Sequence, residues 1–85
     1  MSAYSKDLCI VQFNEATKLG EVKRRVLNAF LEGIMCFQFI LHAKGRKFRD
    51  CVALPKDADE AVALEMAEFQ FSRYVNTVAK LAVGG

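Results

Sequence analysis

Two β-prone segments joined by a short glycine-containing connection constrain the fold of this chain more than any other feature. Residues 34–42 and 46–54 flank Ala43-Lys44-Gly45. A glycine in so short a connection supplies the positive φ that hairpin turns need. We therefore predict a β-hairpin, and Pro55 directly after it marks its end.

The length of the turn decides which residues of the hairpin share a face. A two-residue turn at Lys44-Gly45 predicts one core face and one mixed, basic face. The core face then carries the pairs Leu41/Phe48, Phe37/Val52 and Met35/Leu54. The mixed face carries the pairs His42/Lys47, Ile40/Arg49, Gln38/Cys51 and Cys36/Ala53. Asp50 opposite Phe39 fits poorly, and a three-residue turn would change the pairs, so the sequence leaves the register open.

The remaining segments predict one more strand and two helices. Residues 8–13 (LCIVQF) form a short apolar run of strand formers. From Asn14, a favourable N-cap, apolar residues recur at helical spacing up to Leu31, and Gly33 follows as a helix stop. Asp57 with Glu60 three residues later resembles a capping box, so a second helix starts there and extends to about Ala82.

This order predicts an α+β fold, a β-α-β-β-α two-layer half-sandwich that corresponds to a truncated ferredoxin-like fold. Both helices are expected on one face of a three-stranded sheet. A right-handed crossover followed by a hairpin would place the third strand between the first two, with the first strand at an open edge. The 85 residues are expected to form a single domain, 1–85, because no linker or repeat interrupts them.

Composition narrows the class of protein. The chain is 53% hydrophobic and 26% charged, which is incompatible with disorder. No stretch reaches the ~20 apolar residues of a membrane helix, and residues 1–7 lack the profile of a secretory signal. The three cysteines are widely spaced and odd in number, which favours buried thiols over a disulfide framework. We expect a cytoplasmic protein, or one from an organelle interior, with no membrane partner.

The sequence offers no catalytic or metal-binding constellation. The natural nucleophile and base, Cys51 and His42, would lie four residues or about 13 Å apart along the hairpin. No two cysteines or histidines have the spacing that places two ligands on one ion. We therefore predict that the protein is not an enzyme and has no cofactor, no metal site and no catalytic residue.

Two surfaces are candidates for binding. On the second helix, one stripe is the expected core face: Leu64, Ala67, Phe71, Tyr74, Val75, Val78 and Ala82. Val62, Met66 and Phe69 point nearly the opposite way, and a helix that is apolar on two faces is either buried on both or docks a partner. The hairpin carries the second candidate, a basic group formed by His42, Lys44, Arg46, Lys47 and Arg49.

The first surface leads to our main functional hypothesis. It is a small non-enzymatic protein-interaction module, such as an oligomeric adaptor, an inhibitor or a subunit of a larger assembly, docking through Val62, Met66, Phe69 and the sheet edge. Its partner is another protein or a second copy in a homo-oligomer. The alternative is a small DNA- or RNA-binding protein that uses the basic hairpin, although a net charge of +2 is weak for a nucleic-acid partner.

Overall fold

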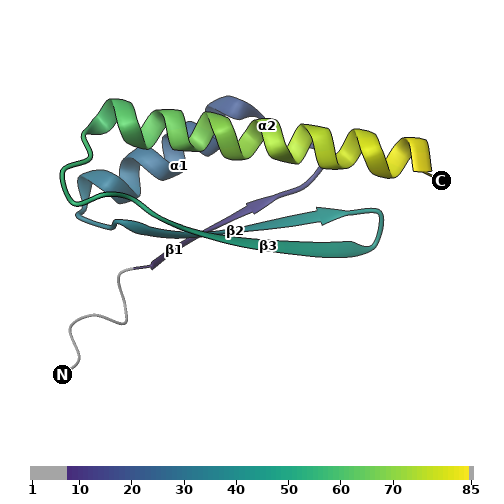
Figure 1. The fold of residues 1–85 in the computed structure, drawn as a ribbon, viewed down its shortest axis with the longest axis horizontal. Coiled ribbons are helices and arrows are strands. Elements are labelled where there is room, and N and C mark those ends of the chain that lie inside the picture. Colours follow the sequence, from purple (N-terminus) through teal and green to yellow (C-terminus); the bar gives the residue numbers. More distant parts are fainter. Residues whose placement is uncertain (1–7, 85) are drawn as a thin grey trace, which may run out of the picture.

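The computed structural model describes residues 8–84, which form two layers (Figure 1). Along the chain the elements are β1 (Leu8–Phe13), α1 (Leu19–Leu31), β2 (Cys36–Ala43), β3 (Arg46–Ala53) and α2 (Glu60–Gly84). The strands form one three-stranded sheet, and both helices lie on the same side of it. The predicted class, element order and two-layer arrangement are confirmed. Residues 1–7, for which the sequence predicts no secretory signal, lie outside the described residues.

The predicted position of the third strand was wrong. The sheet has the order β1-β2-β3, with β1 and β2 parallel and β2 and β3 antiparallel. The physical reason is visible in the two strands. β2 (CFQFILHA) has no carboxylate, lysine or arginine, whereas β3 (RKFRDCVA) has four charged residues in its first five positions. An edge position keeps those charges beside water, and the uncharged strand takes the centre.

The hairpin has the register that a two-residue turn predicts. Leu41 is opposite Phe48, and Asp50 is opposite Phe39. Lys44 and Gly45 have φ values of 53° and 73°, which is the pair of left-handed residues of a type I′ turn. The side chains of β2 are alternately buried and partly exposed, so its odd-numbered residues face the helices.

Helix α1 is capped at Lys18, four residues later than predicted, but ends as expected. Asn14 does not cap it. Instead, the Asn14 side chain accepts the backbone N–H of Ala16 at 2.8 Å and closes a turn. At the other end, Gly33 has a φ of 94°, and the N–H groups of Gly33 and Ile34 bond back to the carbonyls of Phe30 and Ala29. These two bonds are a Schellman motif, which stops the helix.

Helix α2 is capped two residues further along than predicted. The side chain of Asp59, not Asp57, accepts the N–H of Val62 at 3.0 Å. The predicted core stripe of this helix also needs correction. Ala63, Ala67, Gln70 and Tyr74 are buried, whereas Val75 and Ala82 are exposed. The helix is therefore rotated relative to the prediction, so that its polar Gln70 faces inward.

The core lies between the sheet and the helices and is rich in aromatic rings. Phe13 packs edge-on against Phe39 at 5.8 Å and against Tyr74 at 5.1 Å between ring centres. The hydroxyl of Tyr74 donates a hydrogen bond to the carbonyl oxygen of Asn14. These contacts join α2 to β1 and β2 at the end of the sheet that carries the hairpin turn. Among the described residues, no helix is both long and apolar enough to cross a membrane.

Candidate functional site

The natural nucleophile and base of the sequence, Cys51 and His42, lie apart in the hairpin. Cys51 is opposite Gln38, whereas His42 is opposite Lys47. The Nε2 atom of His42 lies 2.7 Å from the Oε1 atom of Gln12 on β1. His42 is therefore held by an amide side chain in a polar part of the sheet. Within residues 8–84, no cluster of three or more His, Cys, Asp or Glu side chains could hold a metal ion.

The expectation that the cysteines are buried was wrong for two of the three. Cys36 and Cys51 are exposed, and only Cys9 is partly buried. Their strand positions explain this, because Cys36 and Cys51 lie on the face of the sheet turned away from the helices while Cys9 faces α1. Burial raises the pKa of the Cys9 thiol, which Arg25 lowers and Glu32 raises to smaller extents.

The face of the sheet opposite the helices, here called the open face, is covered by no element of residues 8–84. One end of it is mostly apolar. Leu8 and Ile10 of β1 are 44% and 46% exposed there. The row of Leu8 continues through Cys36 and Ala53, and the row of Ile10 continues through Gln38 and Cys51. At the hairpin end it is polar and basic, with Gln12, His42, Lys47 and Arg49. Sheets that face water normally carry polar residues on that side, so the apolar end is the unusual part.

Sequence reasoning missed Leu8 and Ile10. Six apolar or uncharged residues in a row, LCIVQF, show no alternation that would separate a buried face from an exposed one. The signal that could have found them is architectural. Two helices on one side of a three-stranded sheet leave the other side bare, so every second residue of an apolar strand must be exposed.

The predicted partner-binding residues of the second helix are only partly available. Val62, Met66 and Phe69 lie on one side of α2 together with Arg73, at spacings of three and four residues. Arg73 forms an ion pair of 2.5 Å with Asp50, so this side faces β3. Val62 and Met66 are half-buried and pack against the core, whereas Phe69 is 62% exposed. Val62 and Met66 therefore lie at the border of the core, and Phe69 is the exposed residue of the three.

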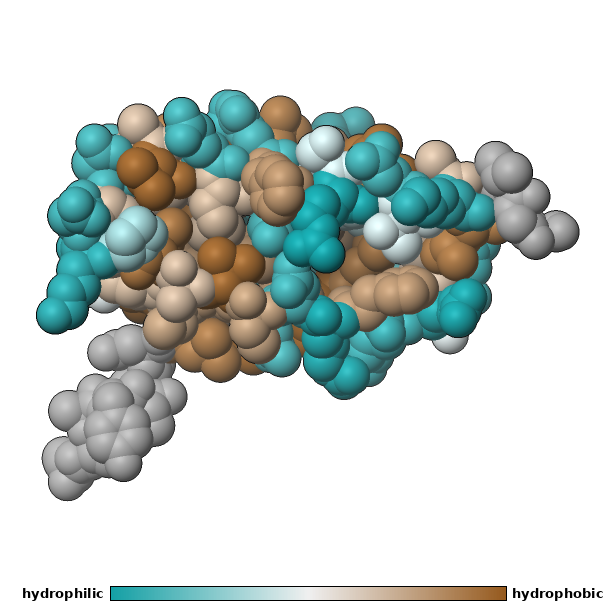
Figure 2. All heavy atoms as spheres, in the orientation of Figure 1, coloured by the Kyte–Doolittle hydropathy of each residue, from teal (hydrophilic) through white to brown (hydrophobic). Residues whose placement is uncertain are grey.

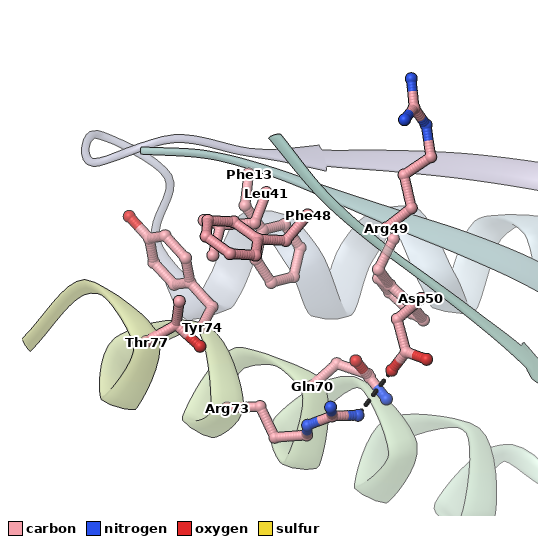
Figure 3. A pocket seen from close by; sticks show the side chains of 10 residues that line it. Phe13, Leu41, Phe48, Arg49, Asp50, Gln70, Arg73, Tyr74 and Thr77 are labelled. Carbon is pink, nitrogen blue, oxygen red and sulfur yellow. Dashed lines mark hydrogen bonds and ion pairs between the residues drawn. The ribbon is translucent and has the colours of Figure 1, made fainter. Parts of the chain in front are cut away.

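The space between α2 and β3 holds a shallow cleft. Figure 2 shows apolar side chains on this side of the molecule, crossed by a band of hydrophilic ones. The cleft has a volume of about 220 Å³ and is lined by Phe13, Leu41, Phe48, Gln70, Tyr74 and Thr77. In Figure 3 the Asp50 and Arg73 side chains meet across one end, while Arg49 points away from it. Nothing in its lining positions a nucleophile beside a base.

The basic residues of the hairpin come together as predicted. Lys44, Arg46, Lys47 and Arg49 are all exposed around the turn, and His42 is half-buried beside them. None of the four exposed cations forms an ion pair with another residue of the described chain. The Arg46 guanidinium carbon lies 5.6 Å from the centre of the Phe48 ring, which restrains it.

Comparisons with known proteins add no assignment. A scan against protein-family models, a search of curated proteins and a search of solved structures each found no match for this chain.

Proposed function

We propose that this protein is a non-catalytic protein-interaction module whose open face is the docking surface. One observation carries the proposal: Leu8 and Ile10 are nearly half exposed at the apolar end of a sheet face that no described element covers. Removing such apolar surface from water is favourable at about 25 cal/mol per Å². A face of this kind therefore gains stability when another surface covers it.

The occupant we propose is a second copy of the chain. Consider a two-fold axis that lies in the plane of the open face and runs across the strands. This axis places the apolar end of one face on the apolar end of the other and sends the two basic hairpins in opposite directions. The like charges of Lys47 and Arg49 on the two copies are then kept apart. Two-fold pairing of one patch with itself is the commonest arrangement of homo-oligomers.

The test is the mass of the protein in solution. We expect size-exclusion chromatography with light scattering to give a dimer that persists at high salt, because its contact is apolar. Ile10→Asp should shift the dimer to monomer while leaving the circular dichroism spectrum unchanged. Val75→Asp is the matched control, since Val75 is 47% exposed but lies on α2, and it should leave the dimer intact.

Either of two results would contradict the open-face dimer. One is a wild-type protein that remains monomeric at about 100 μM. This concentration is well above the dissociation constants of specific homodimers. The other is a dimer that Val75→Asp disrupts as strongly as Ile10→Asp does. Phe69→Ser tests the helix surface predicted from the sequence. Loss of the dimer in that variant would move the interface to α2.

A second candidate function is nucleic-acid binding by the basic hairpin. The supporting observation is that four exposed cations surround one turn without an ion pair among the described residues. Such a group would bind phosphates in a salt-dependent way, because each neutralised phosphate releases counterions. If this is the function, a mixed DNA and RNA pool should bind at low salt, and Lys47→Glu with Arg49→Glu should abolish the binding. Binding that is insensitive to salt would rule this candidate out.

A further inference from the structure

The outer edge of β1 is a second feature of the sheet that another chain could use. β1 pairs only with β2, in parallel, so one row of its backbone N–H and C=O groups has no strand beside it within residues 8–84. An edge of this kind is a template for an added strand. Proteins usually protect such edges with charged residues or proline, and Leu8–Phe13 contains neither.

The opposite edge of the sheet shows the contrast. β3 is also an outer strand, but Arg46, Lys47, Arg49 and Asp50 occupy the half of it next to the hairpin turn. Those charges are the device that normally discourages strand addition. The two edges of one small sheet are therefore built differently, and the uncharged one is β1.

A groove runs beside the β1 edge, and the residues that line it determine which kind of added strand would fit there. The groove has a volume of about 480 Å³ and lies between the strand and α1. Val11 and Gln12 line it from β1, while Val22, Arg24 and Arg25 line it from α1. A strand added beside β1, at the usual spacing of about 4.8 Å, would occupy this space.

The groove has an excess of positive charge that is available to bind a ligand. Arg24 and Arg25 are exposed and have no ion pair within the described chain, whereas the neighbouring Lys23 is bound to Glu68 at 2.8 Å. One carboxylate, Glu21, also lines the groove, and its Oε1 atom accepts the backbone N–H of Lys18 at 2.9 Å. Guanidinium groups are well matched to carboxylates because they can donate two parallel hydrogen bonds.

We propose that the β1 edge binds an extended acidic segment of a partner protein as a fourth strand. Side chains of a strand alternate between the two faces of its sheet. Residues of the segment on the helix side would meet Arg24 and Arg25, so they would be acidic. Residues on the other side would extend the apolar patch of Leu8 and Ile10. The recognised pattern is thus an alternation of acidic and apolar residues. This proposal does not depend on the open-face dimer, since the edge stays accessible in it.

The experiment uses a synthetic octapeptide of alternating glutamate and valine, with blocked ends and a fluorescent label. Binding to the full chain is followed by fluorescence anisotropy at about 150 mM salt, where charges further than about 8 Å away are screened. We expect saturable binding. Arg24→Glu with Arg25→Glu should weaken it by about tenfold or more. Lys44→Glu with Lys47→Glu makes the same change in net charge on the hairpin and should change the affinity by less than about twofold.

Three modified peptides separate strand addition from simple ion pairing. An octapeptide of alternating lysine and valine should not bind, and neither should one with four glutamates followed by four valines. N-methylation on either the glutamates or the valines removes the N–H groups along one edge of the peptide strand. We expect one of these two N-methylated peptides to lose binding and the other to retain it.

Two outcomes would overturn the proposal. If the block peptide or both N-methylated peptides bind as well as the parent, the contact is ionic and no strand is added. If the hairpin variant loses binding as much as the Arg24/Arg25 variant does, the site is elsewhere. The mass in solution tests the open-face dimer separately from the β1 edge. A monomer that binds the peptide contradicts only the dimer, and a dimer that binds none of the peptides contradicts only the β1-edge proposal.

Discussion

At the scale of single residues, Tyr74 connects the longest helix to the rest of the fold. Its ring packs on Phe13 and its hydroxyl donates to the carbonyl oxygen of Asn14, at the start of the loop between β1 and α1. Burial raises the pKa of this phenol above its ordinary value, and the nearby Glu15 raises it further. The neutral form is therefore the one that the folded state favours.

Tyr74→Phe should lower the free energy of unfolding by about 1 kcal/mol at neutral pH, because the ring is kept and one hydrogen bond is lost. The pKa of Tyr74 is higher in the folded state than in the unfolded state. The stabilisation is thus fully present below pH ~10 and is lost as the pH rises through the folded-state pKa. Urea denaturation at pH ~7 and ~11 checks this. The gap between wild type and variant should narrow at the higher pH, and a gap that widens would contradict the assignment.

Asp50 shows how a residue that fits poorly in the sequence acquires a role in the structure. Its position opposite Phe39 placed a carboxylate on the apolar face of the hairpin. In the structure Arg73 of α2 pairs with it, and the Arg73 guanidinium also lies 6.0 Å from the ring centre of Phe69. The two partners are 23 residues apart in the chain, so only the packing of α2 against β3 could reveal the pair.

At the scale of elements, two glycines with open space around them should respond to alanine in opposite ways. Gly45 has a φ of 73° in the hairpin turn, and no atom lies within 4 Å of an added Cβ. Gly45→Ala should destabilise the fold by roughly 1–2 kcal/mol because of the left-handed backbone alone. Gly20 lies in α1, again with nothing within 4 Å, and Gly20→Ala should stabilise the fold by roughly 0.5–1 kcal/mol.

Thermal denaturation of the two alanine variants compares them directly. The melting temperature should fall for Gly45→Ala and rise for Gly20→Ala, since each methyl group enters free space and only the backbone preference differs. A melting temperature that rises or stays the same for Gly45→Ala would show that the turn is not type I′. The comparison therefore tests the hairpin register on which the open face depends.

The strands also show why element order did not determine strand order. A β-α-β-β connection is compatible with either β2 or β3 beside β1. The charge content of the two strands decides between them, since Arg46, Lys47, Arg49 and Asp50 on β3 need water and β2 has no such need. That signal is present in the sequence, whereas the handedness of the crossover does not decide which strand is central.

At the scale of the whole molecule, charge separates along the long axis. The protein measures 46 × 28 × 19 Å. The hairpin turn, with its four exposed cations, lies at the end reached by the C-terminal part of α2, and the acidic start of α2 lies at the other (Figure 1). A net charge of +2 hides this separation. It explains why the proposed open-face dimer keeps the basic ends apart, and why salt is a useful variable in the solution experiments.

The sequence by itself determined the elements and the two-layer class, because these depend on local periodicity, turn chemistry and caps. It also placed the basic residues around one turn. Only the tertiary structure decided that β2 is central, that Val62 and Met66 pack against the core, and that Leu8 and Ile10 are exposed. Those facts depend on which surface covers which. An apolar residue has the same hydrophobicity on either face, and whether it is buried is decided by the element that packs on it.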